Sequence, residues 1–381
     1  MRELGKMKGA AMKVGQMLAL EGRDFLPDEV VEILEQLQNK ASFMSFEDVT
    51  QILNEELKNN IQDLKDIGPE PLAAASIGQV HKAIYKNQVV VIKVQYPHIR
   101  DSIESDVKIL GTLLKGIAVI MRREIEIDGL LKEFGEVFLQ ETDYLQEAVA
   151  MKEYKALAKS IPSLMIPELI EELSTEKVLT MQFLPGKTLT QWLRSEQPTE
   201  AIKLKLAKTI LDLYTAEFCE WGLVQTDPNP GNFLIHPETQ DLILLDFGAT
   251  KKYDMEFRKN YSKLVMASFH QDENLLISMI QKMNLIDPRE SDEAKKILKD
   301  LIYESMRPMT QKYFDFSDKT YANELRRLTQ LLIKELKFSP PPKELIFLHR
   351  KLGGIFQMLS QLEVNIELGH YVKRFEALSV L

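Results

Sequence analysis

Residues 225–248 read QTDPNPGNFLIHPETQDLILLDFG, and this stretch says more about the fold than any other. It opens with a loop rich in proline, asparagine and glycine, which are residue types that favour turns. Two short apolar runs follow and predict a pair of strands. Asp227 and Asn232 stand in the loop, and Asp246 ends the second run. The stretch therefore predicts three polar side chains carried by a loop and a strand end.

These three side chains suit phosphoryl transfer from ATP, which needs a cation on the phosphates, ligands for Mg²⁺ and a group that positions the acceptor. The spacing of Asp227 and Asn232 is that of the protein-kinase catalytic loop, with Gln-Thr-Asp replacing His-Arg-Asp. An aspartate there can orient a nucleophile or accept its proton. Asn232 and Asp246 offer the hard oxygen atoms that Mg²⁺ prefers. Taken alone, the loop is equally well explained as a turn between two elements.

A candidate for the cation lies upstream, where residues 89–93 read VVVIK. The run matches the V-A-I-K pattern, in which a strand directs a lysine at the nucleotide phosphates. Lysines at strand ends are usually just solvated, so Lys93 alone is a weak signal. Lys93, Asp227 and the Asp-Phe-Gly of 246–248 nevertheless occur in kinase order, and together they predict a kinase-like protein.

The pattern along the chain predicts an α+β, protein-kinase-like bilobal fold with an N-terminal helical extension and a predominantly helical C-lobe. We expect the extension over residues 1–65, an N-lobe with a helical insertion over 66–184, and a C-lobe over 185–381, because helical and β-rich periodicities alternate in that order. The expected elements are a helix over 49–57 behind a capping box at 45–48, strands over 77–85, 89–95, 177–183, 232–236 and 242–245, and helices over 190–195 and 199–221.

Composition excludes several other classes of protein. A formal net charge of -9 argues against a nucleic-acid partner, which would require clustered excess Lys and Arg. The single cysteine, Cys219, permits neither an intramolecular disulfide nor a Cys-based metal site. The sequence shows no signal peptide and no apolar run of the roughly 20 residues that a membrane span needs. We expect a soluble protein of the cytoplasm or an organelle, with peripheral membrane contact at most.

Three further motifs make the prediction of a kinase-like protein more specific. Residues 13–16 read KVGQ, residues 72–81 read LAAASIGQVH where a kinase has Gly-x-Gly-x-x-Gly, and residues 141–147 read ETDYLQE. From about residue 6 to residue 250, the chain resembles the UbiB/ABC1/ADCK family of atypical protein-kinase-like proteins. These motifs are that family's Lys-x-Gly-Gln, alanine-rich and Glu-x-Asp motifs, and the loop of 225–232 also belongs to it.

The resemblance implies a role for each matching residue. Lys93 would contact the phosphates and pair with Glu147. Asp227 would take the catalytic-loop position, and Asn232 and Asp246 would bind Mg²⁺.

The resemblance also implies contributions from more distant segments. Lys13 and Gln16 would reach the nucleotide cleft and meet Glu141 and Asp143. Two sets of residues would contact the nucleotide: Ala73, Ala74, Ala75, Ser76 and Gly78 over the phosphates, and Met181, Gln182 and Phe183 along the adenine.

The residues also bear on the kind of activity. Alanines restrict the backbone freedom that glycines give a phosphate-binding loop, so the nucleotide is expected to be held differently. After residue 248 there is no Ala-Pro-Glu and no stretch long enough for an activation loop. We therefore expect Mg²⁺-dependent binding of ATP or ADP with slow ATP hydrolysis, and we doubt phosphorylation of proteins. The resemblance implies a role in ubiquinone or other isoprenoid lipid biosynthesis, with an isoprenoid lipid, a peripheral membrane partner or lipid-biosynthesis proteins as partners.

Two alternatives remain open. A small-molecule kinase resembling aminoglycoside or choline kinases would share the loop aspartate and asparagine, but it should have histidine where Gln225 stands and it leaves the KVGQ motif unexplained. A nucleotide-gated lipid-binding scaffold would bind ATP without turnover. Such a scaffold has no chemical need for Asp227, Asn232 and Asp246 together, whereas single-turnover hydrolysis would exclude it.

Overall fold

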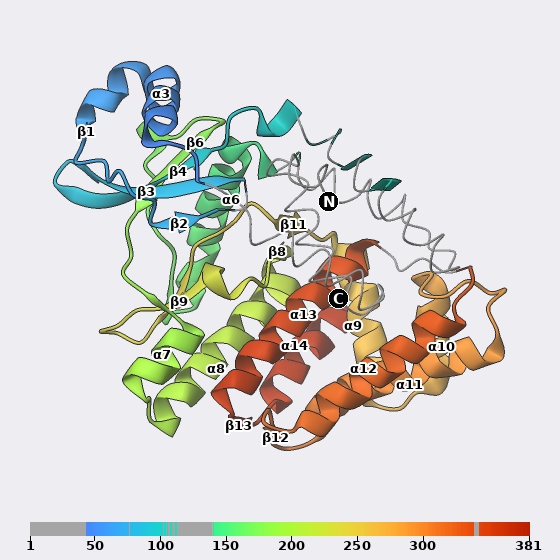
Figure 1. Ribbon diagram of the computed structural model, residues 1–381. Helices are drawn as coiled ribbons and strands as arrows, with labels where there is room; N and C mark the ends of the chain where they lie inside the picture. The colour runs from blue at the N-terminus through green and yellow to red at the C-terminus, as the bar shows by residue number, and fades with distance from the viewer. Residues whose placement is uncertain are drawn as a thin grey trace. The chain divides into compact units, whose positions relative to one another are not determined.

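The computed structural model (Figure 1) shows a mixed α+β, kinase-like architecture, as predicted. The described residues are 43–75, 77–101, 103, 105, 107, 108, 111, 112, 139, 141–338 and 343–381. The chain divides into two compact units. Among the described residues, the first unit contains those up to Glu153 with Pro167–Leu184 and Phe247–Ala249, and the second contains those of Tyr154–Ile166, Pro185–Asp246 and Thr250–Leu381. The predicted boundaries of the extension and the lobes stay predictions.

The first unit is built on an antiparallel sheet. Its strands are β1 (Leu64–Lys65), β2 (Ala73–Ala74), β3 (Gly78–Tyr85), β4 (Gln88–Gln95) and β6 (Val178–Gln182). The order is β1-β3-β4-β6, and β2 pairs with β3 beside it. Lys86 and Asn87 join β3 to β4 with φ angles of 46° and 63°, a two-residue turn whose backbone twist matches that of paired strands. The two strands predicted over 77–85 and 89–95 are therefore present and pair as a hairpin, with Gln88 already in the second strand.

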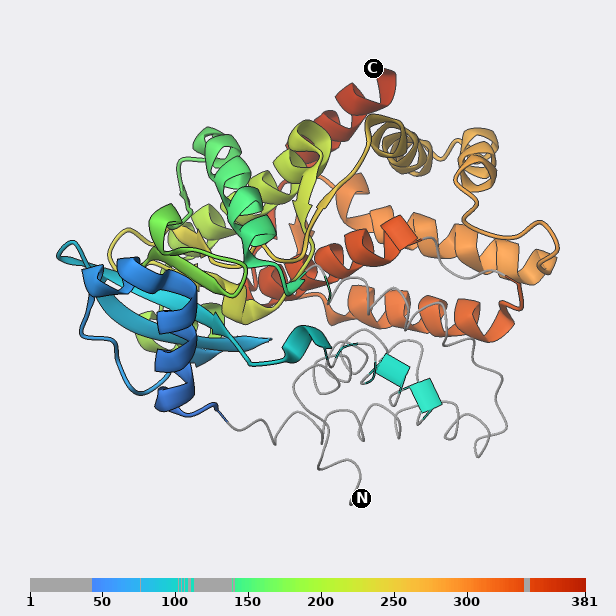
Figure 2. The ribbon, with the colours of Figure 1, turned by 90° about the horizontal axis from the view of Figure 1, so that it is seen from above.

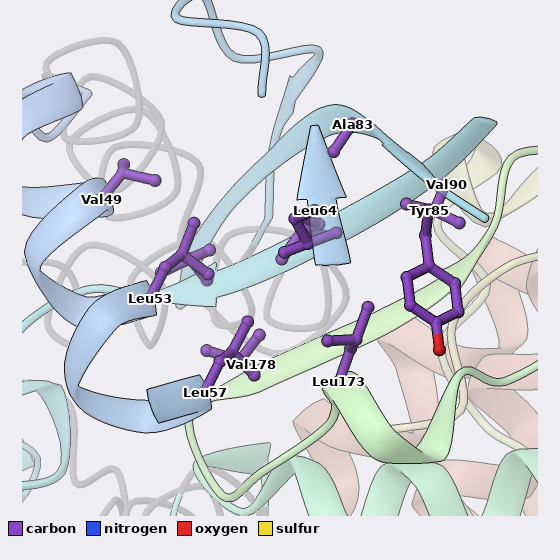
Figure 3. Packing of buried hydrophobic residues seen from close by; sticks show 11 residues of the cluster. Val49, Leu53, Leu57, Leu64, Ala83, Tyr85, Val90, Leu173 and Val178 are labelled. Atoms are coloured by element: carbon purple, nitrogen blue, oxygen red, sulfur yellow. The ribbon is translucent and has the colours of Figure 1, made fainter. Parts of the chain in front are cut away.

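Helix α3 (Phe46–Leu57) covers one face of this sheet (Figure 3). Val49, Leu53 and Leu57 point from one side of the helix into a buried apolar cluster. The sheet contributes the other side of the cluster, including Val90 and Val178. Side chains at spacings of four residues share one helix face, and burial of that face is what attaches α3 to the sheet.

Ser45 is the N-cap residue of α3 and forms the predicted capping box with Asp48. Its Oγ accepts a hydrogen bond from the Asp48 backbone N–H at 3.1 Å, and the Asp48 carboxylate accepts one from the Ser45 N–H at 3.3 Å. Ser45→Ala is expected to lower the free energy of unfolding by about 1 kcal/mol because a helix N–H loses its acceptor. Urea titration measures the change. Gln51→Ala, on the exposed side of the same helix, should stay within about 0.5 kcal/mol. Equal losses in the two variants would contradict the capping role.

The second unit holds a smaller sheet in the order β5-β10-β9-β7. Its strands are β5 (Leu164–Met165), β7 (Lys187–Thr188), β9 (Phe233–Ile235) and β10 (Leu242–Leu244). Strands β9 and β10 form an antiparallel hairpin in which Phe233 pairs with Leu244 and Ile235 pairs with Leu242. A further pair joins β8 (Leu223–Gln225) to β11 (Thr250–Lys252), and β12 (Phe314–Asp315) pairs with β13 (Asn365–Ile366).

Helices make up most of the second unit. They are α7 (Leu189–Glu196), α8 (Glu200–Thr215), α9 (Met255–Phe269), α10 (Glu273–Lys282), α11 (Asp292–Thr310), α12 (Lys319–Glu335), α13 (Lys343–Leu362) and α14 (Gly369–Val380). Helices α13 and α14 both pack along α8 (Figure 1). Helices α11 and α12 run side by side as a hairpin, which is clearest from above (Figure 2).

One predicted helix changes character before it ends. The pattern predicted a single helix over 199–221, but α8 ends at Thr215 and Ala216–Trp221 form a π-helix. Gly222, with a φ of 66°, then turns the chain into β8. Arg258 of α9 donates hydrogen bonds to the Phe218 and Cys219 carbonyls, which lie near the helix end, where carbonyl groups lack partners along the helix. Sequence periodicity did not reveal the change from α-helix to π-helix, because a π turn adds one residue to the helix turn without changing the apolar character of the segment.

Within the described part of the chain, no helix is both long and apolar enough to cross a bilayer.

Candidate nucleotide and magnesium site

Lys93 forms a buried ion pair in the first unit. Its Nζ lies 3.0 Å from Oε1 and 2.9 Å from Oε2 of Glu147, so one ammonium group binds both carboxylate oxygens. Lys93 comes from β4 and Glu147 from α6 (Tyr144–Leu157). The Tyr144 ring centre lies 4.8 Å from the same Nζ. The side chains of Lys93 and Glu147 are 9% and 3% exposed, so the ammonium is held in a fixed place, as a phosphate-binding lysine requires.

Asp143 explains why Glu147 stands where it does. Asp143 precedes α6, and its Oδ1 accepts a hydrogen bond from the Leu145 N–H at 3.0 Å while Oδ2 accepts one from Gln146 Nε2 at 3.0 Å. An aspartate that accepts N–H bonds in this way fixes the start of a helix. Glu147 follows one turn later. Glu141 lies just before this cap and is partly buried. Lys13 and Gln16, which were predicted to meet Glu141 and Asp143, lie outside the described residues.

The alanine-rich segment forms a small hairpin. Ala73 and Ala74 make up β2 and pair with Val80 and Gln79 of β3, and the Ala75 N–H donates to the Gly78 carbonyl at 2.9 Å. Ser76 lies outside the described residues. A Cβ on Gly78 would stand 2.1 Å from the Val94 carbonyl oxygen. Gly78 is thus needed for the close approach of β3 to β4, and contact of this segment with phosphates stays a prediction.

The predicted adenine-lining residues lie at the end of β6. Met181 is buried and Gln182 is the last residue of the strand. The Phe183 N–H donates to the Val89 carbonyl at 3.1 Å, and Lys82 Nζ lies 4.0 Å from the centre of the Phe183 ring. The chain leaves the first unit after Leu184. The nucleotide contacts of these residues remain predictions.

The second unit brings together Asp227, Asn232 and Asp246. Asn232 immediately precedes β9, and Asp246 follows β10 with only Leu245 between them. Both residues therefore lie at the same end of one hairpin. The Leu245 N–H donates to the Asn232 carbonyl at 3.0 Å across that end. Asn232 Nδ2 donates to Asp227 Oδ2 at 2.7 Å. Asn232 and Asp246, predicted from the sequence, thus lie at one end of the hairpin, and Asp227 is hydrogen-bonded to Asn232 there.

Asn232 and Asp246 are suited to a magnesium ion. The Asn232 amide nitrogen is directed at Asp227, which leaves the amide oxygen as the ligand atom. An amide oxygen and a carboxylate are hard donors, and Mg²⁺ binds one or two of them while keeping several waters. Among the described residues no three His, Cys, Asp or Glu side chains gather as a metal cage. The donor set therefore fits Mg²⁺ bound together with a nucleotide.

Arg350 was not anticipated from the sequence. It lies on α13, and its Nη2 donates to Asp227 Oδ1 at 2.8 Å. Arg350 is 123 residues from Asp227 along the chain, and only tertiary structure unites them. The pattern of α13, with Arg350 and Lys351 side by side between His349 and Leu352, is typical of a solvated pair on an amphipathic helix.

Lys351 was missed for the same reason. Its Nζ lies 3.1 Å from Glu217 Oε1 and 3.2 Å from Gln225 Oε1, with the Lys351 and Glu217 side chains 1% and 0% exposed. Burial raises the pKa of Glu217 to about 7, against the opposing effect of Lys351. The Tyr154 hydroxyl also donates to Glu217. Glu217 belongs to the π-helix, a kind of bulge that is frequent at functional sites.

Gln225 links this buried group to the catalytic loop. Its backbone N–H donates to Glu217 Oε1 at 3.2 Å, and its Nε2 donates to the Asp227 carbonyl at 2.9 Å. The amide therefore accepts from Lys351 and donates to Asp227 at once. This double use gives a physical reason for glutamine at the position where kinases carry histidine.

Comparisons with known proteins test the prediction of a kinase-like protein. Residues 36–280 match the ABC1 atypical kinase-like domain. "Probable serine/threonine-protein kinase abkA" of Dictyostelium discoideum is 33% identical over 95% of this chain and 67% of its own length. "Atypical kinase COQ8, mitochondrial" of Saccharomyces cerevisiae is 31% identical over 99% of this chain and 75% of its own length.

A solved structure shares the fold. It is described as "The complex structure of Rv3197-erythromycin from Mycobacterium tuberculosis" and is 23% identical, with a TM-score of 0.65 over 99% of this chain and 92% of the other. The family match covers most of the chain and includes the lysine, the catalytic loop and the Asp-Phe-Gly segment. The chain belongs to the ABC1 atypical kinase-like family, also called UbiB/ADCK.

Proposed function

We propose that this protein binds Mg²⁺ with ATP or ADP and hydrolyses ATP slowly in support of ubiquinone or other isoprenoid lipid biosynthesis. Family membership supports the phosphoryl-transfer class of enzyme. The observation that carries the proposal is the convergence of Asp227, Asn232 and Asp246 at one end of the β9–β10 hairpin. A chain that had lost catalysis would have no chemical reason to keep all three.

Each residue has a defined task in the proposed reaction. Asp227 orients the attacking water. The water oxygen bonds to the γ-phosphorus as the bond from that phosphorus to the β–γ bridging oxygen breaks, and ADP departs with the bond electrons. The water proton passes to the released phosphate or to solvent. Asn232 and Asp246 hold Mg²⁺, which neutralises phosphate charge when bound. Lys93, oriented by Glu147, contributes a second positive charge to the phosphates.

The segment after Asp246 supports hydrolysis over protein phosphorylation. Thr250–Lys252 are already paired with β8, and Asp254 caps α9 by accepting the Phe257 N–H at 2.8 Å. A protein kinase uses a longer segment at this place to present its substrate. The short, paired segment offers a protein substrate little surface to lie on.

The lipid and the compartment come from the relatives. The yeast relative is named a mitochondrial atypical kinase, and the family resemblance connects such proteins with isoprenoid lipids. We extend both to this chain: an organellar compartment, with an isoprenoid lipid or a peripheral membrane protein of lipid biosynthesis as partner. The net charge of -9 disfavours nucleic acid as a partner.

Asp246→Asn tests the magnesium site. We expect ATP and ADP with Mg²⁺ to raise the melting temperature of the wild type, because a ligand at a hundredfold excess over its Kd stabilises the folded state by about 2.7 kcal/mol. The shift should disappear without Mg²⁺ and should be largely lost in the variant. Asp241→Asn is the matched control, since Asp241 lies at the opposite end of the same hairpin and binds Lys205 at 2.7 Å. The control should keep the wild-type shift.

Hydrolysis measured in a single turnover decides between the proposed function and a scaffold. Slow release of phosphate that is lost in Asp246→Asn supports an ATPase. Binding without any turnover would favour the scaffold. Rapid phosphorylation of an added protein, abolished by Asp227→Asn, would overturn the proposal.

A further inference from the structure

Helix α13 holds the catalytic carboxylate from outside the kinase motifs. Arg350 Nη2 donates to Asp227 Oδ1 at 2.8 Å, and Asn232 Nδ2 donates to Asp227 Oδ2 at 2.7 Å. With a donor on each oxygen, rotation about the bond to the carboxyl carbon would break at least one hydrogen bond. Among the described residues, two side chains thus hold the plane of the Asp227 carboxylate, Asn232 from the catalytic loop and Arg350 from outside it.

The Arg350 contact differs from an ordinary surface ion pair. The Arg350 and Asp227 side chains are 12% and 23% exposed, so solvent screens the contact less than it screens an exposed pair. A charged hydrogen bond of 2.8 Å is in the short, strong range for such donors. The acceptor is also the one carboxylate that the proposed reaction uses.

The backbone that carries Arg350 is itself anchored against the catalytic loop. The next residue, Lys351, is 1% exposed and binds Glu217 and Gln225. One turn along α13, Gly354 lies so close to Pro228 that an added Cβ would be 2.1 Å from the Pro228 Cβ. Arg350 thus reaches Asp227 from a helix with two further contacts to the same loop, and its position is defined before any nucleotide binds.

We propose that Arg350 is a positioning residue for the phosphoryl-transfer reaction, which aligns the Asp227 carboxylate and offsets its negative charge near the phosphates. This inference rests on the proposed function. An unpaired carboxylate beside a polyphosphate would be repelled and would turn away, whereas the guanidinium keeps it in place. Helix α13 then contributes directly to the site, although it lies beyond the matched domain of residues 36–280.

Arg350→Gln, Arg350→Lys and Arg350→Met test the inference in the full chain. We expect Arg350→Gln and Arg350→Met to lower the rate constant of single-turnover ATP hydrolysis about 10- to 100-fold, the range that a misplaced reacting group produces. The Kd for ATP with Mg²⁺ should change less than about threefold, because Arg350 acts on Asp227 and leaves the metal ligands in place. Arg350→Lys keeps the charge and should recover part of the rate.

The matched control is Arg374→Gln on α14. Arg374 binds Asp212 at 3.2 Å, an ion pair of the same unit that has no contact with the catalytic loop among the described residues. Its hydrolysis rate should match that of the wild type. In the Asp227→Asn background, Arg350→Gln should have no additional effect on the rate, since the group that it positions is gone.

Each outcome is decisive. Wild-type hydrolysis with an unchanged rate in Arg350→Gln overturns the inference and leaves the proposed function standing. A wild type that does not hydrolyse ATP defeats the proposed function, and crystal structures of the wild type and Arg350→Lys then decide the inference: a turned Asp227 carboxylate in the variant supports it, and an unmoved one overturns it. If Arg350→Gln fails to fold, Arg350→Lys and Arg350→Met carry the kinetic test. Hydrolysis rates equal to that of the wild type in both variants would overturn the inference.

Discussion

Lys351→Met is expected to lower the free energy of unfolding by about 3–5 kcal/mol at pH 8, the loss typical of removing one partner from a buried ion pair. Lys351 and Glu217 are 1% and 0% exposed, with 3.1 Å between Nζ and Oε1. Methionine fills similar space but carries no charge, so the Glu217 carboxylate is left buried without its cation. Urea titration followed by tryptophan fluorescence measures the loss.

The deficit should shrink as the pH falls. Burial raises the folded-state pKa of Glu217 to about 7 from its ordinary 4.5, and loss of the Lys351 charge raises this pKa further. A raised acid pKa means that the folded state binds a proton more tightly than the unfolded state. The stability gained from that proton is complete below about pH 4.5 and is lost as pH rises through the folded-state pKa. Lys351→Met should therefore be much closer to the wild type at pH 5 than at pH 8.

Two further variants make the result specific. Lys205→Met removes the pair between Lys205 and Asp241, in which the lysine side chain is 44% exposed, and it should cost no more than about 1 kcal/mol. The double change Lys351→Met with Glu217→Leu removes both buried charges and should restore most of the lost stability. If Lys351→Met lowered the free energy of unfolding at pH 8 by no more than Lys205→Met does, the buried pair would not contribute to stability as expected.

Gly354→Ala and Gly353→Ala are expected to have effects of opposite sign. A Cβ on Gly354 would lie 2.1 Å from the Pro228 Cβ and 3.2 Å from the Pro228 Cα, whereas nothing lies within 4 Å of a Cβ on Gly353. Both changes favour the helix by up to about 1 kcal/mol. Gly354→Ala should still destabilise the protein, because overpacking costs about 1–3 kcal/mol, and it should slow hydrolysis by displacing the catalytic loop.

Thermal unfolding and single-turnover hydrolysis of the two glycine variants provide the measurement. Because the two residues are consecutive in α13, the gain in helix propensity is the same for both, and only the neighbour of the new methyl group differs. Two equally stable variants would show that α13 does not press against Pro228.

Local motifs allowed several positions of the candidate site to be predicted. The Asp227-to-Asn232 loop and the strand before Asp246 are continuous in sequence, so their patterns predicted a loop and a strand end, and the structure joins the two strands into a hairpin with both metal-ligand candidates at one end. The pairing of Lys93 with Glu147 was implied by the family resemblance and is present, with Nζ–Oε distances of 2.9 and 3.0 Å.

The supporting residues could not be predicted because the chain brings them from far away. Arg350 meets Asp227 across 123 residues, and Lys351 meets Glu217 across 134. Charged residues on an amphipathic helix are normally solvated, and the residues beside these two do not mark Lys351 as buried or Arg350 as half-buried. The one available signal is the pair Gly353-Gly354 inside a helix, which is unfavourable for helix formation and hence suggests a close neighbour.

The pairing of β11 with β8 has a consequence for regulation. Thr250 is already in register with Gln225, Tyr253 donates its N–H to the Gly222 carbonyl at 2.8 Å, and α9 begins at Met255. Many protein kinases are switched on when a phosphate orders the loop at this point. Here residues 250–252 are already paired with β8, so a phosphate would have no unpaired segment to order at this point. We therefore expect phosphorylation of this segment not to raise the rate of the proposed ATP hydrolysis. That rate should depend instead on the concentrations of nucleotide and of a partner.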